Sequence, residues 1–198
     1  MSEQQISNAP NTEHRGVSRS MADTVRIGVW SAAVVAIGYL PHIPNVEGVS
    51  LTIALAGAVL GWKAGLMVGV IGEGLYSLFN PWGPPGPFLL VSQIIGMATV
   101  GATAGFVQKI FPGNKFTHKL GWAVTGFLVT LWFDSVTTLS FPLASGMDSK
   151  AIAVILAQQF IFSLLHLLSN ALLFGIVLVP LRDRLRRFLE TSLFRSAT

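Results

Sequence analysis

The sequence predicts an all-α, polytopic membrane protein built as a six-transmembrane-helix bundle. Three observations predict this fold: the composition, the series of apolar segments, and the distribution of basic residues. The 198 residues are 52% hydrophobic and 11% charged, with a mean hydropathy of +0.62. A soluble domain carries about 25% charged residues, so the chain is far too apolar for that class. Six spans use nearly everything after residue 24 and leave no room for a second folded domain.

The apolar segments are expected to be membrane helices in the order Val25–Leu40, Val49–Trp62, Ala64–Phe79, Phe88–Val107, Leu120–Phe141 and Ala151–Val179. The first begins close to Arg26 and ends before Pro41. The apolar stretch Leu51–Leu60 is short of the ~20 residues that a perpendicular span needs. Together with the third segment it is expected to form a tight, tilted hairpin whose ends are covered by protein.

Basic residues sort to one side of this arrangement. Twelve of the thirteen Lys and Arg residues fall on one face, and only Lys150 falls on the other. Cytoplasmic loops collect Lys and Arg, so both termini are predicted to be cytoplasmic, in a prokaryotic inner membrane. The twelve are Arg15, Arg19, Arg26, Lys63, Lys109, Lys115, Lys119, Arg182, Arg184, Arg186, Arg187 and Arg195.

Outside the membrane domain of residues 25–180, two polar ends are expected. Residues 1–24 are polar and aperiodic, which predicts a disordered cytoplasmic tail, and a cleaved signal sequence is the less favoured alternative. Residues 181–198 form a basic cytoplasmic tail whose arginines are expected to meet anionic headgroups rather than nucleic acid. Cysteine is absent, which excludes disulfides, thiol catalysis and cysteine-based metal sites.

Three ionisable side chains fall inside the predicted spans: Glu73, Asp134 and His166. Such residues are costly at membrane depth and should face a cavity or a partner. Glu73 and Asp134, with Gln93 and Gln159, would lie in the outer half of the bundle, and His166 would lie near its middle. These polar groups would therefore converge below the proline-containing loops 41–50 and 80–87. Trp132, with Trp82 and Phe162, would add flat apolar walls. The pattern predicts a small-molecule pocket, the alternative being that these groups hydrogen-bond one another between helices.

Small residues recur at four-residue spacing, which allows close approach of helix backbones. Gly57, Gly61, Gly65 and Gly69 run through the second and third segments, where internal packing is the favoured interpretation. Gly28, Ala32 and Ala36 form one face of the first helix. That face is expected to pack internally or to meet a partner protein.

An enzymatic interpretation is weaker. His166 and Asn170 have the H-x-x-x-N spacing of rhomboid proteases, and Ser145 precedes a glycine, but the serine lies in an outer loop and before the histidine. Converging metal ligands are lacking in the sequence, so no metal or cofactor is expected. A rhomboid-like hydrolase and a stand-alone carrier remain the alternatives to a transporter subunit.

The chain resembles the substrate-binding S components of energy-coupling factor (ECF) transporters over residues 25–187. The resemblance is carried by six short spans, Ala32-x-x-x-Ala36 in the first helix and the loop Pro44-Asn45-Val46-Glu47. It is also carried by the glycine-rich hairpin that ends in Leu78-Phe79-Asn80-Pro81-Trp82-Gly83, and by a last helix running from His166 to Pro180 before a basic tail.

That resemblance implies a binding subunit that takes a vitamin or related micronutrient from outside. It would associate with a membrane T component and two cytoplasmic ATPases, and this chain itself has no Walker A motif. The resemblance implies that Ala32 and Ala36 meet the T component. It also implies substrate contacts at Asn45, Glu47, Gln93, Asp134, Gln159 and His166, whereas Glu73 rests on its depth in the bundle. The carboxylates suggest a cationic or donor-rich compound, such as a thiamine-like, cobalamin-related or nucleobase-like one.

Overall fold

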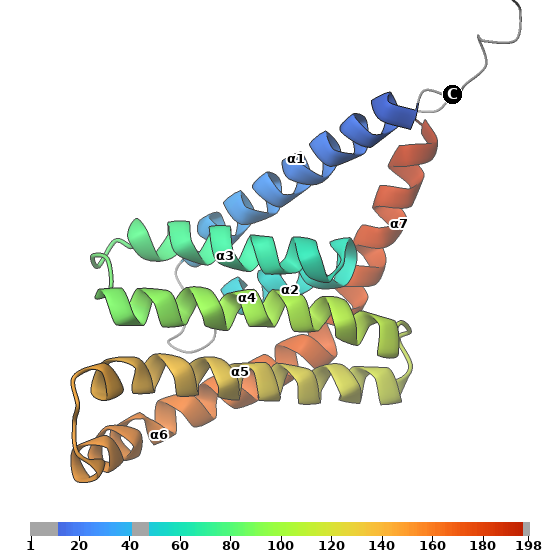
Figure 1. The fold of residues 1–198 in the computed structure, drawn as a ribbon. Helices are drawn as coiled ribbons and strands as arrows, with labels where there is room; N and C mark the ends of the chain where they lie inside the picture. Colours follow the sequence, from blue (N-terminus) through green and yellow to red (C-terminus); the bar gives the residue numbers. More distant parts are fainter. Residues whose placement is uncertain (1–11, 41–47, 196–198) are drawn as a thin grey trace, which may run out of the picture.

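The computed structural model describes residues 12–40 and 48–195, and within these ranges the regular structure is entirely helical (Figure 1). The predicted all-α fold is therefore confirmed. The elements are α1 (Thr12–Gly38), α2 (Gly48–Leu60), α3 (Trp62–Leu78), α4 (Pro87–Ile110), α5 (Phe116–Ala144), α6 (Ser149–Leu172), the π-helical segment η2 (Leu173–Leu178) and α7 (Val179–Arg195).

Four helical stretches of the described chain are long and apolar enough to cross a membrane: Met21–Gly38, Pro87–Ile110, Phe116–Ala144 and Ser149–Thr191. The two remaining helices are shorter. With 13 residues, α2 is about 20 Å long, which is less than the ~30 Å hydrocarbon thickness of a bilayer. It packs against α1, α3 and α4 and buries most of its side chains, so protein covers it as expected.

The glycines of the α2–α3 hairpin bring three helix backbones close together. A Cβ on Gly57 or Gly65 would collide with the backbone carbonyl of Gly101 on α4, and a Cβ on Gly69 would collide with that of Met97. Only glycine leaves room for this approach, so the internal-packing interpretation is confirmed. Gly61 forms the turn with φ of +98°, a backbone conformation that L side chains rarely adopt.

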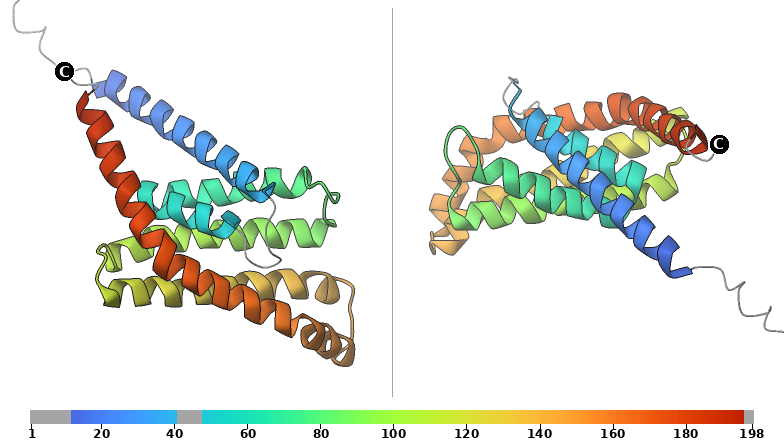
Figure 2. Two further views of the ribbon diagram at one scale, coloured as in Figure 1. Left: turned by 180° about the vertical axis from the view of Figure 1, so that it is seen from behind. Right: turned by 90° about the horizontal axis from the view of Figure 1, so that it is seen from above.

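The first helix begins earlier than hydropathy predicts. It starts at Thr12 rather than at Val25, so residues 12–24 of the expected disordered tail are helical. Residues 181–195 of the basic C-terminal segment are also helical, and η2 carries the chain from α6 directly into α7 (Figure 2). Pro180 follows η2, and a wider turn at this point relieves the clash between its ring and the preceding carbonyls.

One arginine of the basic segment does not face the headgroups that the sequence suggested. The Arg182 side chain is fully buried and lies 5.9 Å from the centroid of the Trp122 ring. It donates to Gln108 Oε1 at 2.9 Å and to the carbonyl of Gly113 at 3.0 Å, and it pairs with Asp183 at 2.7 Å. Arg182 therefore fastens α7 to the α4–α5 connection.

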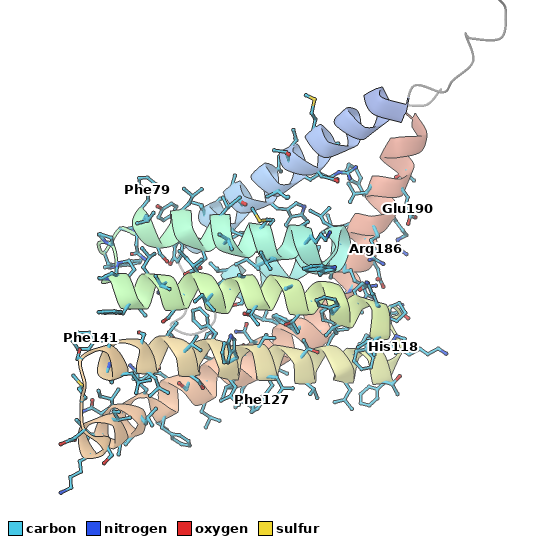
Figure 3. All side chains as sticks on the ribbon, viewed as in Figure 1. Phe79, His118, Phe127, Phe141, Arg186 and Glu190 are labelled. Atoms are coloured by element: carbon cyan, nitrogen blue, oxygen red, sulfur yellow. The ribbon has the colours of Figure 1, made fainter. Side chains whose placement is uncertain are left out.

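The bundle has two distinct ends. The α3–α4 and α5–α6 connections lie at one end, near Phe141, and the α4–α5 connection lies at the other, near His118 (Figure 3). The α2–α3 turn also lies at the His118 end, as do the N-terminal end of α1 and the C-terminal end of α7 (Figure 1). We call these the Phe141 end and the His118 end. The predicted outer loop 80–87 lies at the Phe141 end.

Candidate functional site

The centre of the candidate site is a contact between two ionisable side chains. His166 Nδ1 on α6 lies 2.7 Å from Asp134 Oδ1 on α5. The Asp134 and His166 side chains are only 14% and 8% exposed. An ionised carboxylate only accepts hydrogen bonds, so the imidazole donates through Nδ1 when Asp134 is charged. The second carboxylate oxygen, Oδ2, is buried and has no hydrogen-bond partner among the described residues.

A second polar link lies one helical turn further along α6. Asn170 Nδ2 donates to Thr130 Oγ1 at 3.0 Å, and Asn170 is fully buried. The Phe133 ring stands edge-on to the His166 ring, with centroids 6.2 Å apart. These contacts hold α5 and α6 together below the Asp134–His166 pair and fix the direction in which that pair points.

An open groove of about 410 Å³ lies beside this pair, among α4, α5 and α6 at the Phe141 end. This is the size of groove or pocket that accommodates a small organic ligand. Of the residues predicted from sequence, Gln93, Asp134 and Gln159 line it, and His166 is connected to it through Asp134. The full lining is Leu89, Gln93, Phe133, Asp134, Thr137, Thr138, Phe141, Pro142, Ile155, Gln159, Phe162 and Ser163.

Glu73 is connected to the groove indirectly. The Ser77 hydroxyl lies 2.9 Å from Glu73 Oε1 and 3.2 Å from Gln93 Oε1, so it bridges α3 to α4. Glu73 and Ser77 are both buried. Glu73 does not line the groove itself, and its carboxylate instead supports the position of Gln93, which does.

Two expectations about the walls are not met. Trp132 does not line the groove and is 46% exposed, because it lies two residues, or about 200°, around α5 from Asp134. Trp82 is 83% exposed and also lies outside the lining. The flat walls come instead from Phe133, Phe141 and the predicted Phe162. Asn45, Glu47 and the loop around them lie outside the described residues.

Sequence reasoning missed Phe133 and Phe141 as parts of the site. A signal existed for Phe141, because it is seven residues and two turns beyond Asp134. The one-turn spacing between Glu73 and Ser77 does predict that these two share a helix face. Phe133 is adjacent to Asp134 in sequence, and spacing alone does not reveal that it reaches the groove.

The geometry does not support a serine–histidine pair. The His166 ring binds Asp134, whereas Ser145 follows the end of the same helix α5, eleven residues later. At 1.5 Å per residue that separation is about 16 Å along the helix axis. Ser145 is thus too remote from His166 for hydrogen bonding, which requires about 3 Å.

The small-residue face of α1 is uncovered in the described structure. Gly28, Ala32 and Ala36 are all exposed, and a Cβ on Gly28 would meet nothing within 4 Å. Val34, on the opposite side of α1, is fully buried. The helix therefore packs on α2 and α3 through the face that carries Ser31 and Val34, and it presents the face with Gly28, Ala32 and Ala36 outward.

Comparison with known proteins places the chain in a family. The model of the family described as ECF-type riboflavin transporter, S component, matches residues 18–187. The biotin transporter BioY of Rhodobacter capsulatus is 30% identical over 140 residues. That similarity covers 66% of this chain and 62% of the relative, so the chain spans less than two thirds of that protein's length. The apolar helices and the family match support a multi-pass membrane protein. The resemblance seen in the sequence is thus confirmed, and the chain belongs to the S-component family of ECF-type riboflavin transporters.

Proposed function

We propose that this chain is the substrate-binding membrane subunit of an ATP-driven ECF importer for a vitamin or vitamin-like micronutrient. The observation that carries the proposal is the groove at the Phe141 end, where Gln93, Asp134 and Gln159 meet three phenylalanine rings. Family membership supports a transporter subunit rather than an enzyme. The related protein BioY is named a biotin transporter, which supports the same class of cargo.

The chemistry of the groove favours a flat, donor-rich heterocycle. Phe133, Phe141 and Phe162 offer apolar faces and edges against which a planar ring can pack. The Asp134 carboxylate offers an acceptor whose Oδ2 atom has no partner within the described protein. A rotation of the Asp134 side chain toward the groove would let an N–H or cationic group on the substrate satisfy this atom, whose burial without a partner is costly. Among the classes considered, thiamine-like and nucleobase-like compounds fit this description.

The proposed partners are a membrane T component and two cytoplasmic ATPases. The exposed Gly28–Ala32–Ala36 face of α1 supports docking of a partner helix, because small side chains let two backbones approach closely. The chain contributes no ATP-binding motif of its own to such an assembly.

The test begins with mass spectrometry of small molecules that co-purify with the protein, followed by titration calorimetry with the compound identified. Asp134→Asn should weaken binding about 10- to 100-fold, as for loss of a charge-assisted hydrogen bond. Phe162→Ala should weaken binding, whereas Trp132→Ala, a matched aromatic outside the groove, should leave it unchanged. Equal effects of the two aromatic variants, or cleavage of a membrane peptide that depends on His166, would overturn the proposal.

A further inference from the structure

A second hollow lies at the His118 end of the bundle and shares no residue with the groove. It encloses about 470 Å³ between α1, the α2–α3 turn and α7. Seen from above, the N-terminal end of α1 and the C-terminal end of α7 lie apart at this end of the molecule (Figure 2, right). Its lining consists of Asp23, Arg26, Ile27, Val59, Leu60, Lys63, Ala64, Met67 and Leu189.

The hollow combines apolar walls with a basic rim. Six of its nine lining residues are aliphatic or methionine, and the charged ones are Asp23, Arg26 and Lys63. Asp23 pairs with Arg26 at 3.3 Å in an exposed contact, which is a weak interaction in water. Lys63 adds a second cation, so the rim carries an excess of positive charge.

The neighbouring side chains place this rim at the level of lipid headgroups. Lys63 Nζ lies 5.6 Å from the centroid of the Trp62 ring, which stacks on Phe106 at 5.2 Å. Lys109 Nζ lies 5.7 Å from the centroid of the same Phe106 ring. Aromatic rings that alternate with lysines are typical of the boundary between hydrocarbon and water. The hollow therefore opens where the phosphates of a bilayer would lie.

We propose that this hollow binds one anionic phospholipid. The phosphate would lie between Arg26 and Lys63, and the glycerol and first acyl carbons would cover Ile27, Leu60 and Met67. Basic pockets between membrane helices recognise acidic headgroups in this way. A free inorganic anion would satisfy the cations but leave the apolar walls exposed, and an uncharged lipid would do the reverse.

The test uses native mass spectrometry of the full chain in a neutral detergent, titrated with phosphatidylglycerol or with phosphatidylcholine. Phosphatidylglycerol should form a one-to-one adduct with at least tenfold preference. Each basic side chain contributes about fivefold, so Arg26→Gln combined with Lys63→Gln should weaken the adduct about 25-fold. Asp23→Asn should strengthen the adduct, because it removes the acidic group among the described residues that line the hollow. Lys150→Gln, at the Phe141 end, is the matched control and should change affinity less than twofold.

A second variant separates a built site from diffuse attraction between charges. Ala64→Phe keeps both cations but fills the hollow, and it should abolish the adduct while thermal unfolding stays within a few degrees. An adduct that survives Ala64→Phe, or that Lys150→Gln weakens equally, would overturn the proposal. Competition by millimolar inorganic phosphate would point to a free anion instead. Binding that occurs only after deletion of residues 1–11 would identify this chain's own N-terminal segment as the occupant.

Discussion

The contact between Asp134 and His166 joins two groups that are individually costly to bury. Each satisfies part of the hydrogen-bonding capacity of the other, and the hydrogen bond between Asn170 and Thr130 lies one turn further along α6. Removing one partner leaves the other buried without this contact, whereas removing both at once leaves neither group behind. The pair should therefore behave as a unit.

A double-mutant cycle tests this coupling. Asp134→Leu and His166→Phe should each lower the free energy of unfolding by about 1–3 kcal/mol. The combined variant should lose clearly less than the sum of the two, because it leaves neither Asp134 nor His166 buried without the other. The measurement is denaturant unfolding in detergent. Strict additivity would show that the two side chains act independently.

At the scale of single residues, the sequence indicated which polar side chains lie at the site, but it did not indicate which aromatic side chains line the groove. Asp134 and His166 could be singled out because ionisable groups inside apolar segments need a partner or a cavity. Trp132 lies two residues before Asp134 in the sequence, but the rotation of about 200° between them on α5 places it outside the lining of the groove. Arg182 was assigned to headgroups because a run of arginines looks uniform, whereas helical geometry buries Arg182 and also turns Arg186 toward the Ala58 carbonyl of α2.

Among the helices, the contact of the α2–α3 hairpin with α4 depends on glycines that face one another. Gly65 and Gly101 each occupy the space in which the other would place a Cβ, and the obstructing atoms are backbone carbonyls that have little room to move. The spacing of glycines in the sequence correctly predicted that the α2–α3 hairpin packs closely inside the protein. Its partner Gly101 was not identified, because spacing within one helix does not reveal which other helix it faces.

Substitution at Gly101 should separate packing from helix propensity. Gly101→Ala should destabilise the protein by about 1–3 kcal/mol, because the added methyl group overpacks the interface with Gly65. Gly28→Ala, where a Cβ meets nothing, should instead be neutral or stabilise by up to about 1 kcal/mol. Thermal unfolding of both variants in one detergent gives the comparison. Destabilisation of similar size at both positions would contradict the close-packing interpretation.

The opposite faces of α1 allow a matched test of the partner proposal. Ala32→Trp should disrupt assembly with the T component and uptake, while substrate affinity and unfolding temperature remain close to those of the unmodified protein. Val34→Trp, placed on the buried face, should impair folding and binding together. Assembly is measured by co-purification with the T component. Equal loss of binding and assembly in Ala32→Trp would reject the partner-facing assignment.

Over the whole molecule, the segregation of charge and the two-ended bundle point to one orientation. Lys63, Lys109 and the arginines of α7 lie at the His118 end, and Lys150 lies at the Phe141 end. Basic residues mark the cytoplasmic side, so the groove should open outward. The overall order of helices was predictable from apolar segments. The start of α1 was not, because its first turns are polar and lack the hydropathy signal that marks the rest.

Orientation can be measured directly because the chain has no cysteine of its own. A single cysteine at Lys150 should react with a membrane-impermeant thiol reagent in intact cells. Single cysteines at Lys115 and Arg184 should react only after the membrane is opened. The reverse pattern would show that the orientation is inverted. If cysteines at Lys115 and Arg184 are labelled from different sides, an odd number of spans lies between them, which would contradict the proposed six-span arrangement.

The continuous helical stretch from Ser149 to Arg195 joins the two ends of the molecule. Near its start, Gln159 and Ser163 border the groove, and near its end Arg182 anchors α7 to the α4–α5 connection. If the N-terminal part of this helical stretch moves while its C-terminal part is held in place, the stretch should bend where its hydrogen bonding is least regular. In this protein that place is η2, where the hydrogen-bond ladder changes register. A movement of α6 toward a substrate in the groove would thus bend the helix at residues 173–178 and leave α7, which Arg182 anchors, in place.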